Sequence, residues 1–239
     1  MPESTRGIVF STTEYGETSL IARIYTEQFG LQSYIISSVR RKHAKTHSGI
    51  FQPLTPVDLI AYHKKRPAVQ RIKEVRPEPL LTGIPFSMTK RSMILFLDEV
   101  LIKSIREEEP NPGLFEFLFK SIVWLDGISD PSPDFHLIFL LRLTRYLGFA
   151  PTPSYDEDKT FFDFREGSFL SGPPNHPNYI TGKWPSLFAR LMEAKYAVAS
   201  PLTVEERKQL LIYILEFYQL HVEGFGNIKS YKVLEQVWE

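Results

Sequence analysis

The chain has 239 residues, 43% hydrophobic and 23% charged, and its 28 Lys and Arg balance its 28 Asp and Glu, as in a folded globular protein rather than a disordered one. The absence of cysteine excludes disulfides, thiol nucleophiles and every cysteine-ligated zinc or iron–sulfur site. No apolar run approaches the ~18 residues of a membrane span, and the first residues lack a signal-peptide pattern, so we expect a cytoplasmic protein.

Residues 1–80 predict a small barrel of short β-strands. Segments rich in β-branched and aromatic residues alternate with turn signals, and they cover 6–13, 18–26, 31–39, 55–63 and 68–76. The longest connection, residues 40–51, lies between the third and fourth segments. This arrangement fits the five-stranded OB-fold barrel. A generic small antiparallel barrel is the alternative.

Helical periodicity replaces the strand pattern after Pro85. Ser87 is a candidate N-cap, Gly148 a stop signal, and Thr203 with Glu206 a capping box. Helices are expected over residues 87–108, 114–125, 135–147, 185–199, 203–224 and 230–237. The fold class is therefore α+β: an OB-fold nucleic-acid-binding domain at 1–80 and a mainly helical C-terminal domain at 81–239, with an irregular, proline-rich segment at about 150–182 that holds two β-type patches.

Sequence motifs of common enzymes are missing. The chain has no GxxxxGK[ST] phosphate loop, no GxGxxG and no GxSxG, so we expect a protein that is not an enzyme and needs no cofactor. His43 and His47 are four residues apart, a spacing that could place two imidazoles on one metal. Four neighbouring cations would repel a metal ion there, and no metal is predicted.

Charge is distributed unevenly along the chain. Residues 1–91 contain 14 Lys and Arg against 7 Asp and Glu, whereas residues 92–239 contain 14 against 21. The excess is concentrated in one loop, one turn and one strand, and the candidate DNA-binding residues are Arg40, Arg41, Lys42, Lys45, Lys64, Lys65, Arg66, Arg71 and Lys73. Arg71 and Lys73 are two apart, which predicts one face of the last strand. Ordinary solvated surface is the alternative for the whole set.

A cationic barrel surface would bind nucleic acid through phosphates, without sequence preference. OB barrels add aromatic side chains on which bases stack. Tyr34 and Tyr62 are the candidates, and strand alternation makes each equally a candidate for the core.

Several motifs carry a family resemblance. "GIV" (7–9), "YGETSLI" (15–21), "YTE" (25–27) and "FQPL" (51–54) match the opening of the recombination mediator RecO family, and "RYLGF" (145–149) and "IKS" (228–230) match its helical part. The chain resembles this family over nearly its whole length. It departs from the family at Ser38-Val39, where Gly-Ala is usual, and at 151–182, where many members carry four zinc-binding cysteines. Packing of Phe161, Phe162, Phe164 and Phe169 is expected to replace the metal.

The resemblance implies a DNA repair and recombination mediator of the DNA damage response. Such a protein binds single- and double-stranded DNA and anneals complementary strands. With RecR and RecF, in the RecFOR pathway, it helps load RecA on DNA coated by single-stranded-DNA-binding protein (SSB), and its place is the nucleoid of the cytoplasm. A general OB-type single-stranded RNA-binding factor is the alternative. A scaffold whose basic face docks an acidic protein is a third reading.

The resemblance also implies binding of the SSB C-terminal tail, which is acidic and ends in an apolar residue with a free carboxylate. Such a ligand needs apolar surface with a cation at its edge. The segment 135–147 offers both, and the candidate residues are Leu141, Arg142 and Arg145. The alternative is that the two arginines are C-terminal helix charges favoured by the dipole.

Overall fold

The computed structural model describes residues 1–37, 39, 48–63, 69–106, 108–198 and 201–235. These residues form two compact units, Met1–Ser129 and Asp130–Glu239. The first unit therefore contains two long helices as well as the barrel. The domain boundary predicted after residue 80 stays a prediction. No helix among the described residues is long and apolar enough to cross a membrane.

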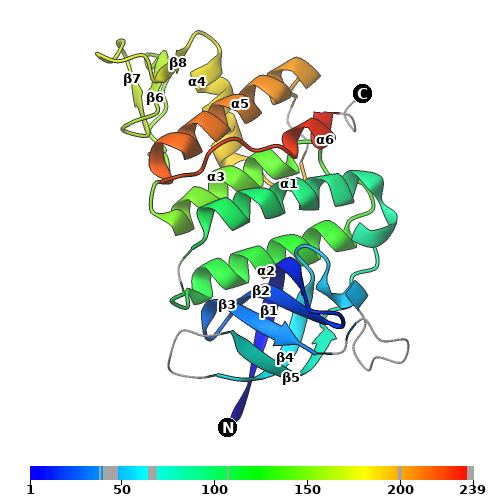
Figure 1. The fold of residues 1–239 in the computed structure, drawn as a ribbon. Helices are drawn as coiled ribbons and strands as arrows, with labels where there is room; N and C mark the ends of the chain where they lie inside the picture. The colour runs from blue at the N-terminus through cyan, green and yellow to red at the C-terminus, as the bar shows by residue number, and fades with distance from the viewer. Residues whose placement is uncertain (38, 40–47, 64–68, 107, 199–200, 236–239) are drawn as a thin grey trace. The chain divides into compact units, whose positions relative to one another are not determined.

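The predicted five-stranded barrel is confirmed (Figure 1). Its strands are β1 (Pro2–Tyr15), β2 (Ser19–Thr26), β3 (Gly30–Ile36), β4 (Pro56–Tyr62) and β5 (Gln70–Pro77). They close in the order β1-β2-β3-β5-β4, and β3 and β5 pair in parallel through Tyr34↔Gln70 and Ile35↔Arg71. The other neighbours are antiparallel, so closure removes the exposed sheet edges that invite aggregation.

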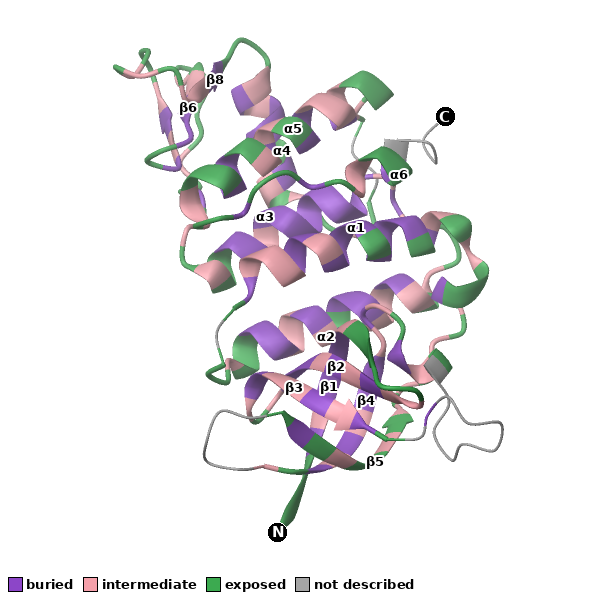
Figure 2. Ribbon diagram, in the orientation of Figure 1, coloured by how far each residue is buried: buried purple, intermediate pink, exposed green. Residues whose placement is uncertain are grey.

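Strand alternation builds the barrel core. Inward positions are fully buried and mostly β-branched or aromatic, among them Val9, Ala22, Ile24, Tyr34, Val57 and Leu59. Figure 2 shows this alternation of buried and more exposed positions along the strands. Gly7 marks a close approach between strands, because a Cβ there would lie 2.6 Å from Ile24 Cγ2.

Helices α1 (Met88–Ser104) and α2 (Pro112–Gly127) complete the first unit. Ser87 caps α1 as predicted, with its side chain accepting from Lys90 N at 3.3 Å. Helix α2 begins at Pro112, two residues earlier than predicted, because Asn111 caps it and proline is tolerated in the first turn. It packs on the barrel through Phe115, whose ring centroid lies 6.4 Å from that of Tyr25.

A partly buried polar cluster fixes the segment before α1, which contains the 3-10 turn η2 (Ile84–Phe86). The Asp126 carboxylate accepts backbone hydrogen bonds from Thr82 at 2.9 Å, Gly83 at 2.8 Å and Ile84 at 2.6 Å. The buried Lys90 ammonium donates to the carbonyl of Asp126 at 2.9 Å and to that of Ile128. Residues far apart in sequence are thereby held together without an unsatisfied buried charge.

The second unit is helical with one small sheet. Its helices are α3 (Phe135–Leu147), α4 (Trp184–Glu193), α5 (Val204–His221) and α6 (Tyr231–Glu235). The predicted bounds of α3 are confirmed, and Gly148 ends it in the left-handed conformation at φ +86°. The predicted capping box of α5 is also present. Helices α4 and α5 end earlier than predicted, at Glu193 and His221.

The irregular segment contains three short strands, β6 (Phe161–Asp163), β7 (Ser168–Leu170) and β8 (Tyr179–Thr181), in the order β7-β6-β8. Phe162 is fully buried, and its ring centroid lies 4.7 Å from that of Phe169 and 4.6 Å from that of Phe188 on α4. Aromatic packing thus holds this sheet to the helices. Among the described residues, no group of three His, Asp or Glu could hold a metal ion.

Candidate nucleic-acid interface

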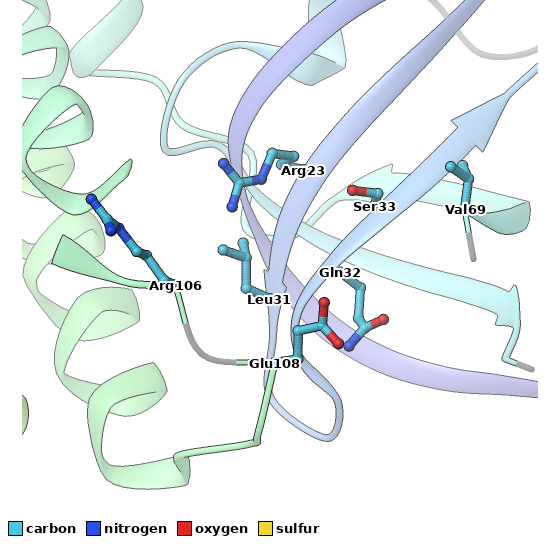
Figure 3. Close-up of a pocket in the computed structure, with 7 residues that line it drawn as sticks. All are labelled: Arg23, Leu31, Gln32, Ser33, Val69, Arg106 and Glu108. Atoms are coloured by element: carbon cyan, nitrogen blue, oxygen red, sulfur yellow. The ribbon is translucent and has the colours of Figure 1, made fainter. Parts of the chain in front are cut away.

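A pocket of about 250 Å³ lies on the outer face of β2 and β3 (Figure 3). Residues of β2 and β3, the residue before β5 and the segment after α1 line it: Arg23, Leu31, Gln32, Ser33, Val69, Arg106 and Glu108. The described residues that line it include two arginines and one glutamate, which give them a net positive charge. The β2–β3 face and the β4–β5 loop are where OB barrels bind oligonucleotides.

Arg23 is the residue that β2 contributes to this pocket. Alternation places it outward, because Ala22 and Ile24 are both buried in the barrel core. Its neighbours across the sheet are Ser11 and Ser33, whose small side chains leave room for the guanidinium. Figure 3 shows it extending toward the side from which Arg106 comes. No ion pair joins Arg23 to another described residue.

Arg23 is not among the predicted DNA-binding residues, because those are cations that cluster in the sequence. The sequence feature that indicates Arg23 is a single arginine between two apolar core residues of the second strand, Ala22 and Ile24. Such a residue must face outward, on the face that OB barrels use for ligands. The tertiary structure adds Arg106, which is distant in sequence.

The two predicted basic clusters lie outside the described residues. They are Arg40, Arg41, Lys42 and Lys45 in the β3–β4 connection and Lys64, Lys65 and Arg66 in the β4–β5 turn. Val69, which lines the pocket, follows the second cluster closely in sequence. The role of both clusters in DNA binding stays a prediction.

Arg71 and Lys73 on β5 are both exposed. The ladder to β4 pairs Ile60 with Glu74 and Ala61 with Ile72, so Lys73 is the extra residue of a bulge. Lys73 Nζ lies 3.3 Å from Glu74 Oε1, an exposed ion pair of small energetic weight. Simple alternation therefore does not describe this part of β5, and the binding role of both residues stays a prediction.

Of the two candidate stacking residues, Tyr34 belongs to the core. It is fully buried, and its hydroxyl lies 2.8 Å from His63 Nε2. Burial lowers the pKa of His63 and so favours its neutral ring, which can accept a hydrogen bond from the tyrosine hydroxyl. His63 also stacks on Phe29, with ring centroids 3.7 Å apart. Tyr62 is 43% exposed and remains available for stacking.

The three predicted tail-binding residues on α3 occupy different environments. Leu141 is buried, with 4% of its surface exposed. Arg142 donates to the Ala194 carbonyl at 2.8 Å and lies 4.5 Å over the Tyr196 ring. Arg145 is exposed in the last turn. Tail binding by this helix stays a prediction.

The fold and the cationic pocket define an OB-barrel protein with an appended helical region. A family model described as "Recombination protein O N terminal" matches residues 1–78, and one described as "Recombination protein O C terminal" matches residues 86–232. The chain therefore belongs to the RecO family of DNA repair proteins.

Curated relatives named DNA repair protein RecO match over the whole chain. DNA repair protein RecO of Bacteroides fragilis is 35% identical, with all of each chain covered. The RecO proteins of Flavobacterium psychrophilum and Phocaeicola vulgatus are 35% and 32% identical over the same full coverage. The resemblance stated from the sequence motifs is confirmed.

Proposed function

We propose that this chain is a strand-annealing recombination mediator. It binds single- and double-stranded DNA, anneals complementary strands and, with RecR and RecF, helps load RecA on SSB-coated DNA, without catalysing a covalent reaction. The observation that carries the proposal is the cationic pocket on the β2–β3 face of an OB barrel in a RecO-family chain.

The chemistry of the pocket suits a phosphate backbone. A guanidinium that displaces counterions from phosphates gains affinity from their release, and this gain does not depend on base sequence. Arg23 is suited to that role because its neighbours in the sheet are serines rather than carboxylates. An annealing protein must bind strands of any sequence, so a backbone-directed site fits the activity.

The helical region supplies the protein-recognition part of the proposal. Residues 92–239 carry 14 Lys and Arg against 21 Asp and Glu, so this region is poorly suited to polyanionic DNA. We assign RecR and the SSB tail to it as partners. We also assign the protein to the nucleoid of the cytoplasm, where its DNA substrate lies.

Annealing of SSB-coated complementary strands, with and without the protein, tests the proposal. Arg23→Ala should slow annealing and weaken DNA binding. Arg76→Ala is the matched control, because Arg76 lies on β5 of the same barrel and is ion-paired with Asp58 at 3.1 Å. Equal rates for wild type and no protein would contradict the mediator function. Preference for RNA over DNA of matched length would favour the RNA-binding alternative.

A further inference from the structure

A second, larger groove lies on the barrel unit and shares no lining residue with the cationic pocket. Its volume is about 570 Å³, within the range of ~300–1,000 Å³ typical of ligand sites. One wall is the chain from Gly49 to Thr55, which includes part of the 3-10 turn η1 (Ser48–Phe51). The other wall runs from the end of β5 through η2 to the first turns of α1.

The groove is aliphatic and open to solvent. Its walls include Ile50, Pro53, Leu80, Ile84, Ile94 and Leu95. Leu80 is 71% exposed and Leu95 47% exposed. Phe86 and Met88, on either side of the Ser87 cap, are also exposed. Contiguous exposed apolar surface of this kind marks an interaction site.

The described residues that line the groove carry charge of one sign. Among the described residues that line it, Arg91 on the first turns of α1 is the only charged one, and its guanidinium forms no ion pair with a described residue. No acidic residue occupies the first turn of α1. In the sequence, the wall residue Gly49 directly follows the acid-free stretch that contains Arg40, Arg41, Lys42 and Lys45.

We propose that this groove docks an acidic peptide segment of a partner protein. Apolar side chains of the segment enter the groove, and a neighbouring carboxylate pairs with Arg91. A carboxylate beside apolar surface requires such a cation. Nucleic acid fits less well, because bases bind on aromatic platforms along a row of cations, whereas these walls are aliphatic and hold one arginine.

The test is selection of short random peptides displayed on phage against the full-length protein. The best selected peptide is then synthesised with a fluorophore and titrated by anisotropy. Selected peptides should combine Leu, Ile, Phe or Met with Asp or Glu. Arg91→Glu and Leu95→Glu should each weaken binding of the peptide by at least about tenfold, which corresponds to about 1.4 kcal/mol of binding free energy. Lys195→Glu and Ile212→Glu are matched controls at exposed positions of the second unit and should bind as wild type.

DNA binding by the same variants separates this site from the cationic pocket. Oligo(dT) affinity should be unchanged by Leu95→Glu, which also shows that the variant is folded. Failure to select any peptide, selection of basic peptides, or undiminished binding by both groove variants would overturn the proposal. Loss of oligo(dT) binding by Leu95→Glu would assign the groove to nucleic acid instead. Self-association of wild type that Leu95→Glu abolishes would assign it to a second copy of the chain.

Discussion

Arg207 and Asp134 form an ion pair in the interior of the helical unit, with Arg207 Nε 2.7 Å from Asp134 Oδ1. The Asp134 side chain is fully buried, and that of Arg207 is 8% exposed. Arg207 also donates to the Leu202 carbonyl at 3.3 Å. The pair connects the residue before α3 with the first turn of α5, which are 73 positions apart in sequence.

Removal of one partner of this pair should destabilise the protein strongly. Arg207→Met leaves a buried carboxylate without its cation, so we expect a loss of about 3–5 kcal/mol of unfolding free energy. Urea denaturation followed by circular dichroism measures it. The double variant Asp134→Leu with Arg207→Met should recover much of the loss, because no charge is then buried. A double variant as unstable as the single one would show that packing, rather than charge, dominates.

The β3–β4 connection should contribute mainly electrostatic affinity. Changing Arg40, Arg41, Lys42 and Lys45 to Ala removes up to four phosphate contacts. Each contact accounts for a slope of ~0.7 in log K against log salt on single strands, so the quadruple variant should flatten the slope by up to ~3. Arg23→Ala should flatten it by up to ~0.7, and Arg76→Ala should leave it unchanged. An unchanged slope in the folded quadruple variant would move the DNA site elsewhere.

Helix α3 should bind the SSB tail through Arg145. Arg142 already contacts Ala194 and Tyr196, whereas Arg145 is exposed. Arg145→Ala should therefore weaken binding of a fluorescent SSB-tail peptide more than Arg142→Ala does. Thermal melts of both variants control for folding. Wild-type affinity in both would place the tail site off this helix.

The aromatic cluster should stabilise the three-stranded sheet without zinc. Phe162→Ala removes a fully buried ring and should cost about 3–5 kcal/mol, whereas the half-exposed Phe161 should be less sensitive. A chelator should not change the thermal midpoint, because a structural zinc would contribute folding energy directly. Elemental analysis giving near one zinc per chain would contradict this. The search for ligands would then begin with His176, which pairs with Asp163 at 3.1 Å, and with Asp156 and Asp158.

Asp98 on α1 should make stability fall as pH rises. Burial raises its pKa from 3.8 to about 8, and its Oδ1 has no hydrogen-bond partner among the described residues. Between pH 3.8 and about pH 8, the unfolded chain has lost the proton that the folded chain keeps. The unfolded state then binds fewer protons than the folded state, so the free energy of unfolding falls as pH rises. Asp98→Asn removes this dependence.

Melting temperatures at pH 5 and pH 7 measure the effect. The increase in melting temperature caused by Asp98→Asn should be larger at pH 7 than at pH 5. Asp130→Asn, at an exposed position, is the control and should show no such difference. An equal gain at both pH values would indicate that Asp98 is ionised in the folded protein.

Local patterns determined most of the secondary structure. The strands of the barrel follow period-two alternation, and α3 and α5 begin or end at residues whose conformational preferences are strong: Gly148 at positive φ and the Thr203–Glu206 capping box. The motifs of the first strands and the missing cysteines were sufficient to indicate the family and the departure from its zinc site. These signals depend on neighbours within a few positions, so sequence alone carries them.

Tertiary structure decided what depends on distant residues. The bulge at Lys73 arises from pairing of β5 with β4, and the pocket around Arg23 combines two strands with the segment after α1. The groove at Arg91 joins residues 49–55 to residues 77–95, and the Asp134–Arg207 pair spans most of the helical unit. Local propensity cannot specify such contacts, because their free energy is gained only after packing has brought the separate segments together.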